Sequence, residues 1–371
     1  MHPAIKRRSR LFRLVWLVLA CFGCTGPALA DPAAADACDH RLASYLRAVL
    51  ADDVDQAARH WRPADIVSAG RLEIRYTGLP LKVDGDSPLW AYREAIRSGR
   101  VSCRRERPTP VVSGALAGVM CQVVVLAAGA DTTRFPTYFA EQDGDWLLTS
   151  PTMLLAAPDR DRSSLYVAVH DRRSPAPPGG REFAPAQLDS CVGRMMVALG
   201  FAESAEARLA HGKLGDLLLD PADVERLAGA PTVGVANLQQ DVIVTSHPCH
   251  AHELAHLVVN VWLQDLPLYM LPLLQEGTAV HLGGRWGRHP RVMERLGRTT
   301  LTDGLLTLDD LLARDDFLRQ PADLTYAPAG VFAGFLLSTY GTAGLRNACL
   351  AVSASNVGVA KAVGDGFIDN T

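Results

Sequence analysis

The sequence predicts an α+β fold with two units in its mature part. Helix-like segments come first, and they are followed by valine-rich and other apolar runs that enclose an acidic-glycine turn, which indicates an antiparallel sheet. After a proline-rich stretch, helical and short strand-like segments alternate, which predicts a sheet with helices packed around it. A chain of 371 residues is long enough for two units that each bury their own core.

Residues 1–30 have the pattern of a signal peptide. Five Lys and Arg side chains precede the apolar run 14–24, and Ala-Leu-Ala at 28–30 forms a small-x-small cleavage site. The run is shorter than the roughly 18 residues that a spanning helix needs, so we expect a periplasmic or secreted protein with no transmembrane segment after cleavage. The alternative is a lipoprotein anchored through Cys21, because Val-Leu-Ala-Cys at 18–21 resembles a lipobox.

The net charge and the number of cysteines indicate which partners and which covalent links to expect. Removal of the signal takes away five positive charges and no negative ones, so the net charge falls from −3 to −8. We therefore expect no nucleic-acid partner. Six cysteines remain, and in an oxidising compartment disulfides are expected. Cys103 and Cys121 flank a turn region and could face each other across a hairpin, whereas Cys249 is expected to pair with Cys191 or Cys349.

The first unit is expected to span residues 36–157. Its clearest signals are a continuous valine-rich run and an Asp-Gly turn between two apolar runs, which is typical of a hairpin. The expected elements are helices at 41–50 and 54–61, strands at 119–127 and 135–141, the turn 142–145 and a closing strand that begins at 146.

The second unit is expected to span residues 160–371. The boundary is placed near residue 158, because the stretch 159–181 combines a charged run with a proline-glycine cluster and only a short strand at 165–169. Prolines and glycines suggest several helix ends. The expected elements are helices at 186–199, 221–228, 248–262, 272–282, 308–313 and 329–340, and strands at 213–219 and 241–245.

The strongest chemical signal is the motif His252-Glu253-Leu254-Ala255-His256. On a helix, its two histidines lie one turn apart on the same face and can direct ring nitrogens to one metal ion. Glu253 lies about 100° further round the helix, where it can take a proton from a metal-bound water whose pKa is lowered to about 7. The helix is otherwise apolar, so unpaired histidines would be costly there. These residues predict a Zn²⁺ site with Glu253 as the general base.

A catalytic zinc also needs a third protein ligand and an open position. A metzincin would have glycine and histidine at the positions of Val259 and Trp262, so that class is excluded. Glu276, 20 residues after His256 and on a separate predicted helix, is the remaining candidate. The alternative is that Glu276 is an ordinary carboxylate near a helix start.

The two segments His-Glu-Leu-Ala-His and Leu-Leu-Gln-Glu-Gly-Thr-Ala-Val-His-Leu resemble the signature of gluzincin zinc metallopeptidases. The Glu-Gly-x-Ala form is similar to the peptidase-MA-like family, over about residues 210–345. This resemblance implies a thermolysin-like zincin domain with a mixed sheet and an active-site helix, peptide hydrolysis, and zinc bound by His252, His256 and Glu276. It also implies that an edge strand borders the cleft.

The sequence departs from this pattern at Val280, where thermolysin has an aspartate that orients a ligand histidine. The orienting hydrogen bond must then come from Asn260 or from a backbone carbonyl. The first unit, with helices before a curved sheet, resembles the cystatin-like cone of the nuclear-transport-factor-two and SnoaL-like families, which implies a binding or positioning role.

Several tyrosines and histidines near the motif each have two alternative roles. Tyr326 is the first candidate to steady an oxyanion, with Tyr340 and Tyr269 as rivals, and each could instead be a packed aromatic residue. Three further histidines could be ligands or substrate contacts, but solvated or capping roles are favoured. They are His247, His250 and His281.

The resulting hypothesis is an exported zinc peptidase that binds a peptide or protein substrate along strand 241–245. The first alternative is a noncatalytic, zinc-stabilised binding or envelope-assembly protein that retains the gluzincin fold. The second is a zinc enzyme whose substrate is not a peptide.

Overall fold

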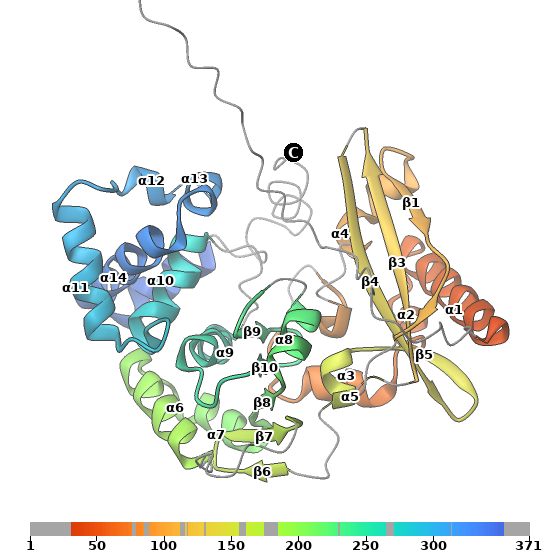
Figure 1. The fold of residues 1–371 in the computed structure, drawn as a ribbon, viewed down its shortest axis with the longest axis horizontal. Coiled ribbons are helices and arrows are strands. Elements are labelled where there is room, and N and C mark those ends of the chain that lie inside the picture. Colours follow the sequence, from red (N-terminus) through yellow and green to blue (C-terminus); the bar gives the residue numbers. More distant parts are fainter. Residues whose placement is uncertain are drawn as a thin grey trace, which may run out of the picture.

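The computed structural model describes residues 31–351 except 76–78, 85–88, 112–115, 117, 130, 156–160, 174–184, 229–230, 265–270 and 313. The chain is an α+β protein with two separate sheets, as predicted (Figure 1). The predicted signal peptide, Cys21 and Tyr269 lie outside the described residues. No helix within the described segments is long and apolar enough to cross a membrane.

The first sheet is antiparallel, with strand order β1-β3-β4-β5 and with β2 also paired to β3. Its buried face packs against helices α1 and α4 around Tyr45, Trp90 and Phe139. The elements of this part are α1 (Pro32–Leu50), α2 (Val54–Ala58), α3 (Pro63–Gly70), the 3-10 helix η1 (Lys82–Asp84), α4 (Leu89–Arg97), β1 (Ser102–Arg105), β2 (Thr109–Pro110), β3 (Val119–Ala128), β4 (Asp131–Gln142), β5 (Asp145–Thr149) and α5 (Pro151–Leu155).

The predicted hairpin between β4 and β5 is confirmed. Gln142 pairs with Asp145, and both residues between them have positive φ, at 55° for Asp143 and 87° for Gly144. A two-residue turn of this kind requires residues that tolerate the left-handed region, which explains the Asp-Gly pair.

The predicted pairing of Cys103 with Cys121 is wrong. Cys103 lies opposite Leu126 on β3, whereas Cys121 lies opposite Thr109 and Tyr138. The two cysteines are therefore at different levels of the sheet, because β2 intervenes between β1 and β3 along the chain. All six cysteines among the described residues are free thiols, so the expected disulfide of Cys249 with Cys191 or Cys349 is also wrong, although the Sγ atoms of Cys249 and Cys191 lie 3.9 Å apart.

The second sheet is mixed, with strand order β6-β7-β8-β10-β9. Strands β7, β8 and β10 are parallel, while β6 and β9 run antiparallel at the two edges. Its elements are β6 (Asp161–Ser163), β7 (Val167–Asp171), α6 (Pro185–Leu199), α7 (Glu203–Gly212), β8 (Leu214–Leu218), α8 (Pro221–Ala228), β9 (Gly234–Asn237), β10 (Val242–Thr245), α9 (Ala251–Leu263), α10 (Pro272–Gly283), α11 (Pro290–Thr302), α12 (Asp309–Leu312), α13 (Arg314–Arg319) and α14 (Ala322–Ala351).

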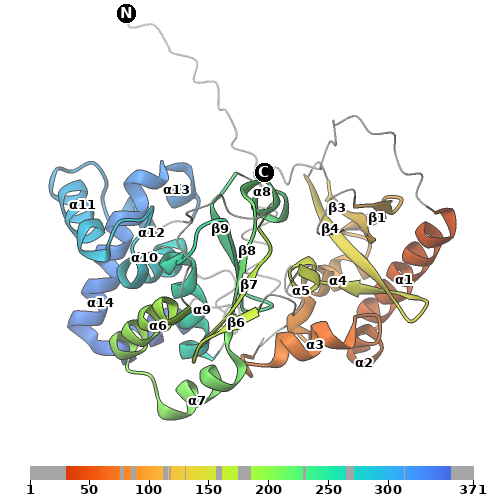
Figure 2. The same cartoon turned by 60° about the horizontal axis from the view of Figure 1, so that its bottom comes forward.

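The central strands are buried on both faces. Figure 2 shows α6 and α9 on one side of the sheet and α5 on the other. Ile243 belongs to the core on the α6 and α9 side, while Val242 and Val244 pack with Leu155 of α5 on the opposite side. Helices α10, α11 and α14 form a bundle beyond α9 (Figure 1).

Two expectations about this part are corrected. A peptide cannot pair along strand β10, because β8 and β9 already occupy both of its edges; the edge strand next to it is β9. Helix α9 begins at Ala251 rather than at Pro248, because His250 is its N-cap residue and Cys249 adopts a positive φ of 64°.

The segment after α3 connects the two parts of the molecule. Leu72 and Ile74 are buried in the core of the second sheet. Arg71 donates hydrogen bonds to the carbonyl oxygens of Gln240 and Asp241, just before β10. The first part therefore contributes side chains to the core that supports the second sheet.

Candidate metal centre

Two helices carry the residues of the predicted zinc site. The ring of His250 caps α9 by accepting a hydrogen bond from the backbone N–H of Glu253 at 3.5 Å. Eleven of the thirteen residues of α9 are buried, so the helix is fixed by its core contacts. Helix α10 starts at Pro272, whose ring favours a helical φ, and ends at Gly283; the capping residue Gly284 has a positive φ of 74°.

The structure brings His252, His256 and Glu276 together. Their ligand atoms all lie within 4.8 Å of one another. Glu276 Oε2 is 3.1 Å from His252 Nε2 and 3.6 Å from His256 Nε2. The two imidazole rings meet edge to face with centroids 5.0 Å apart. Two nitrogens on one helix and one oxygen on the next thus converge on a single point.

The orientation of His252 is set by a backbone carbonyl. Its Nδ1 lies 2.9 Å from the carbonyl oxygen of Gly284, so Nδ1 carries the proton and donates it. This turns Nε2, the ring nitrogen left to bind a metal, toward Glu276. Asn260, the other candidate for this role, is buried, and its amide makes no hydrogen bond to any residue that the structure describes.

The charges in the site are strongly coupled. Burial alone would raise the pKa of Glu276, but His256 and His252 beside it lower that pKa well below its usual range. Burial opposes the charged form of His256, yet Glu276 outweighs it and raises the histidine pKa. A buried carboxylate is therefore held in its ionised form by two imidazoles.

Glu253 lies apart from the three converging side chains. Its Oε2 accepts a hydrogen bond of 3.1 Å from the backbone N–H of Ala236 on β9. Because this N–H is used by Glu253, it points away from β10 and toward the free edge of β9. The carboxylate thus lies between the motif helix and the edge strand.

Tyr326 of α14 lies next to the site, as predicted. Its ring centroid is 6.2 Å from that of His252. Burial, with a contribution from Glu276, raises the pKa of its hydroxyl, so Tyr326 remains a neutral hydrogen-bond donor. Tyr340, its described rival, is 62% exposed and contacts Phe335 instead.

One residue of the site has no signal in the sequence. Arg285 Nη1 is 2.7 Å from His252 Nε2 and 3.5 Å from Glu276 Oε2. Its guanidinium stacks 3.5 Å from the ring centroid of Tyr326 and 5.0 Å from that of Trp286. It follows the Gly-Gly end of α10, so only the folded chain reveals its position.

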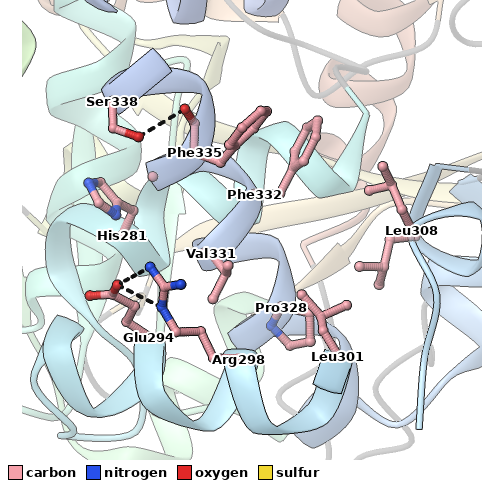
Figure 3. Close-up of a pocket in the computed structure, with 13 residues that line it drawn as sticks. His281, Glu294, Arg298, Leu301, Leu308, Pro328, Val331, Phe332, Phe335 and Ser338 are labelled. Carbon is pink, nitrogen blue, oxygen red and sulfur yellow. Dashed lines mark hydrogen bonds and ion pairs between the residues drawn. The ribbon is translucent and has the colours of Figure 1, made fainter. Parts of the chain in front are cut away.

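The remaining histidines divide between local and remote roles. His250 is a capping residue whose pKa is lowered by burial. His281 does not reach the metal centre; it lines a separate cavity of about 520 Å³ between α10, α11 and α14 (Figure 3). That cavity has mostly apolar walls, and its polar end also contains the ion pair of Arg298 with Glu294.

The donor set is of the kind that holds zinc. Tetrahedral Zn²⁺ has bonds of about 2.1 Å to imidazole nitrogen and carboxylate oxygen, which places neighbouring ligand atoms about 3.4 Å apart. The two nitrogen-to-oxygen separations of 3.1 and 3.6 Å agree with this value. Two histidines and one glutamate are also a ligand set of catalytic zinc, since they leave one position open.

Comparisons of the chain with protein-family models, with curated proteins and with solved structures found no match. The assignment of a function to this centre therefore depends on its own geometry and chemistry.

Proposed function

We propose that this chain is an exported zinc peptidase of the gluzincin type with a thermolysin-like second domain. The observation that carries the proposal is the convergence of His252, His256 and Glu276 within 4.8 Å, with His252 oriented by the hydrogen bond between its Nδ1 and the carbonyl oxygen of Gly284. Zinc, when bound there, would polarise a carbonyl and supply a water of low pKa.

The other residues have separate tasks in this proposal. The substrate backbone lies along the outer edge of β9, the edge that β10 does not use, and takes the Ala236 N–H over from Glu253. Glu253 takes the proton of the attacking water and passes it to the leaving amine. Tyr326 and Arg285 provide a neutral donor and a cation for the developing negative charge.

The first test separates chemistry from metal binding. Glu253→Gln keeps the shape of the side chain and lies outside the ligand set, so zinc should remain bound while turnover falls by about 10²–10⁴-fold. Cleavage of casein and of a mixed peptide library should be measured with and without chelator, beside the zinc content. Peptidase activity retained by the variant would refute the role of Glu253. Intact zinc without turnover in the wild type would favour a binding protein.

The second test concerns the third ligand. Glu276→Ala removes the only carboxylate of the described ligand set and should reduce zinc affinity by at least about tenfold. Glu294→Ala is the matched control, because Glu294 is an exposed glutamate that pairs with Arg298 on α11. Zinc content and competition with a chelator should be measured for both. Equal affinity in the two variants would remove Glu276 from the site.

A further inference from the structure

A second, polar cavity of about 440 Å³ lies at the C-terminal end of α9, at the opposite end of that helix from Glu253. Four parts of the chain meet there: the segment after α3, helix α7, the end of α9 and helix α14. The lining residues are Glu73, Arg75, Arg208, Leu263, Gln264, Arg346 and Leu350.

The charge of this cavity is unusual for the chain. Three arginines face a single glutamate, and guanidinium groups stay protonated at every physiological pH. The cavity therefore carries a net charge of about +2 in a chain whose overall charge is −3. A local excess of positive charge on a net negative protein favours an anion.

The three arginines of this cavity have few partners within the described part of the chain. Arg346 Nη2 donates a hydrogen bond of 3.0 Å to the carbonyl oxygen of Leu263 and so caps α9, which uses one of its five N–H groups. Arg208 Nη2 is buried and has no hydrogen-bond partner among the described residues. Arg75 and Arg208 form no ion pair with a carboxylate in the described part of the chain. A buried, unpartnered guanidinium nitrogen is costly unless an external acceptor completes it.

We propose that this cavity binds a phosphoryl group, either inorganic phosphate or the phosphate of a larger molecule. A phosphate presents several acceptor oxygens, which match the planar forks of three arginines. The volume lies within the range of about 300–1,000 Å³ typical of small-molecule pockets, so there is room for more than a single ion.

The position of the site has a structural consequence. Arg75 belongs to the segment after α3, and its backbone N–H also donates to the carbonyl oxygen of Gln264 at 3.2 Å. Arg208 and Arg346 belong to α7 and α14. A phosphoryl group held by all three therefore ties the first part of the chain to the end of the helix that carries His252 and His256.

The test uses inorganic phosphate on the full chain. At ten times its dissociation constant, phosphate should raise the melting temperature by about 2–4 °C more than chloride at equal ionic strength. Arg208→Gln and Arg75→Gln should each weaken phosphate binding, measured by calorimetry, by about tenfold. Arg75 is exposed, so its variant keeps the test valid if the Arg208 variant folds poorly.

The matched control is Arg319→Gln, because Arg319 is an exposed arginine of α13 that pairs with Asp316 outside the cavity. This variant should bind phosphate like the wild type. Equal effects of phosphate and chloride, or unchanged binding in both Arg75→Gln and Arg208→Gln, would overturn the proposal.

A second experiment, with vesicles of phosphatidylcholine with and without phosphatidic acid, identifies the molecule that carries the phosphoryl group. Cosedimentation that depends on both phosphatidic acid and Arg208 indicates a lipid headgroup. Phosphate binding without cosedimentation indicates a soluble ligand.

Discussion

At the scale of single residues, Asp216 in the middle of β8 is a buried carboxyl group without a partner. Both of its carboxylate oxygens are buried and make no hydrogen bond within the described part of the chain. Burial, opposed by the more distant charge of Arg173, raises its pKa to about 7. The folded state therefore binds a proton more tightly at this group than the unfolded chain does.

This shift predicts a specific pH dependence of stability. Because the folded pKa lies above the unfolded value near 3.9, Asp216 costs nothing at low pH and destabilises the fold as pH rises from about 4 through 7. Asp216→Asn should remove this loss, so the stability of the variant relative to wild type should increase by on the order of 3 kcal/mol between pH 4 and pH 8. Urea denaturation at both pH values measures the change.

Asp39→Asn is a control of opposite sign. A hydrogen bond from Arg105 lowers the pKa of Asp39, so its stabilising effect is present at neutral pH and is lost as pH falls through the folded pKa. The variant should be destabilised near pH 7 and should approach wild type at low pH. If the relative stabilities of the Asp39 and Asp216 variants follow the same trend with pH, the explanation by burial is incorrect.

The residues of the metal centre were predictable to different degrees. His252, Glu253 and His256 follow from helical spacing and the chemistry of zinc, and the structure places both histidines beside Glu276. Arg285 was not predictable, because its contact with His252 depends on how α10 ends against α9. Spacing along one helix is a local property, whereas a contact between helices requires tertiary packing.

At the scale of elements, the ends of α10 explain how the site is held. The α-carbon of Gly283 lies so close to α9 that an added Cβ would come within 2.3 Å of the carbonyl oxygen of Ala251 and 2.9 Å of the Cα of His252. The close approach of the two helices therefore requires glycine at this position.

Gly283→Ala should push α10 away from α9 at the level of His252. We expect a loss of about 1–3 kcal/mol in the free energy of unfolding and weaker zinc binding, since the distance from His252 to Glu276 must change. Gly193→Ala in α6 is the control, because an added Cβ there meets nothing within 4 Å and alanine favours a helix by about 0.5–1 kcal/mol. Similar effects of the two substitutions on zinc affinity would contradict the packing argument.

Elements whose limits are set by local signals were predicted closely. Helix α8 spans Pro221–Ala228 as expected, and α10 begins at Pro272 and ends at Gly283. The order of strands was less accessible, because it depends on pairing between distant segments. The role of β9 as edge strand and of β10 as an inner strand shows this, since both are short apolar segments that their own sequences do not distinguish.

At the scale of the whole molecule, a buried ion pair links the two sheets. Lys82, in η1 of the first part, places Nζ 2.5 Å from Asp241 Oδ2, just before β10. Arg71 Nη1 lies 3.9 Å from the same oxygen. The side chains of Asp241 and Lys82 are 1% and 8% exposed, so water cannot replace either partner. The segment that bears Arg71 and Lys82 thus neutralises the negative charge of Asp241. This charge lies next to the second sheet, whose edge strand β9 borders the proposed substrate site.

Removal of one partner should destabilise the whole chain. Lys82→Met leaves Asp241 buried with only the more distant Arg71, and we expect a loss of about 3 kcal/mol in the free energy of unfolding. In the double variant Lys82→Met with Asp241→Asn, most of this loss should be recovered. No buried carboxylate is left uncompensated, Arg71 keeps its hydrogen bonds to the carbonyl oxygens of residues 240 and 241, and asparagine tolerates the positive φ of 51° at position 241. Denaturation followed both by tryptophan fluorescence and by circular dichroism should give one common midpoint shift in Lys82→Met. A shift confined to one probe, or a double variant no more stable than the single one, would show that the pair does not couple the two sheets.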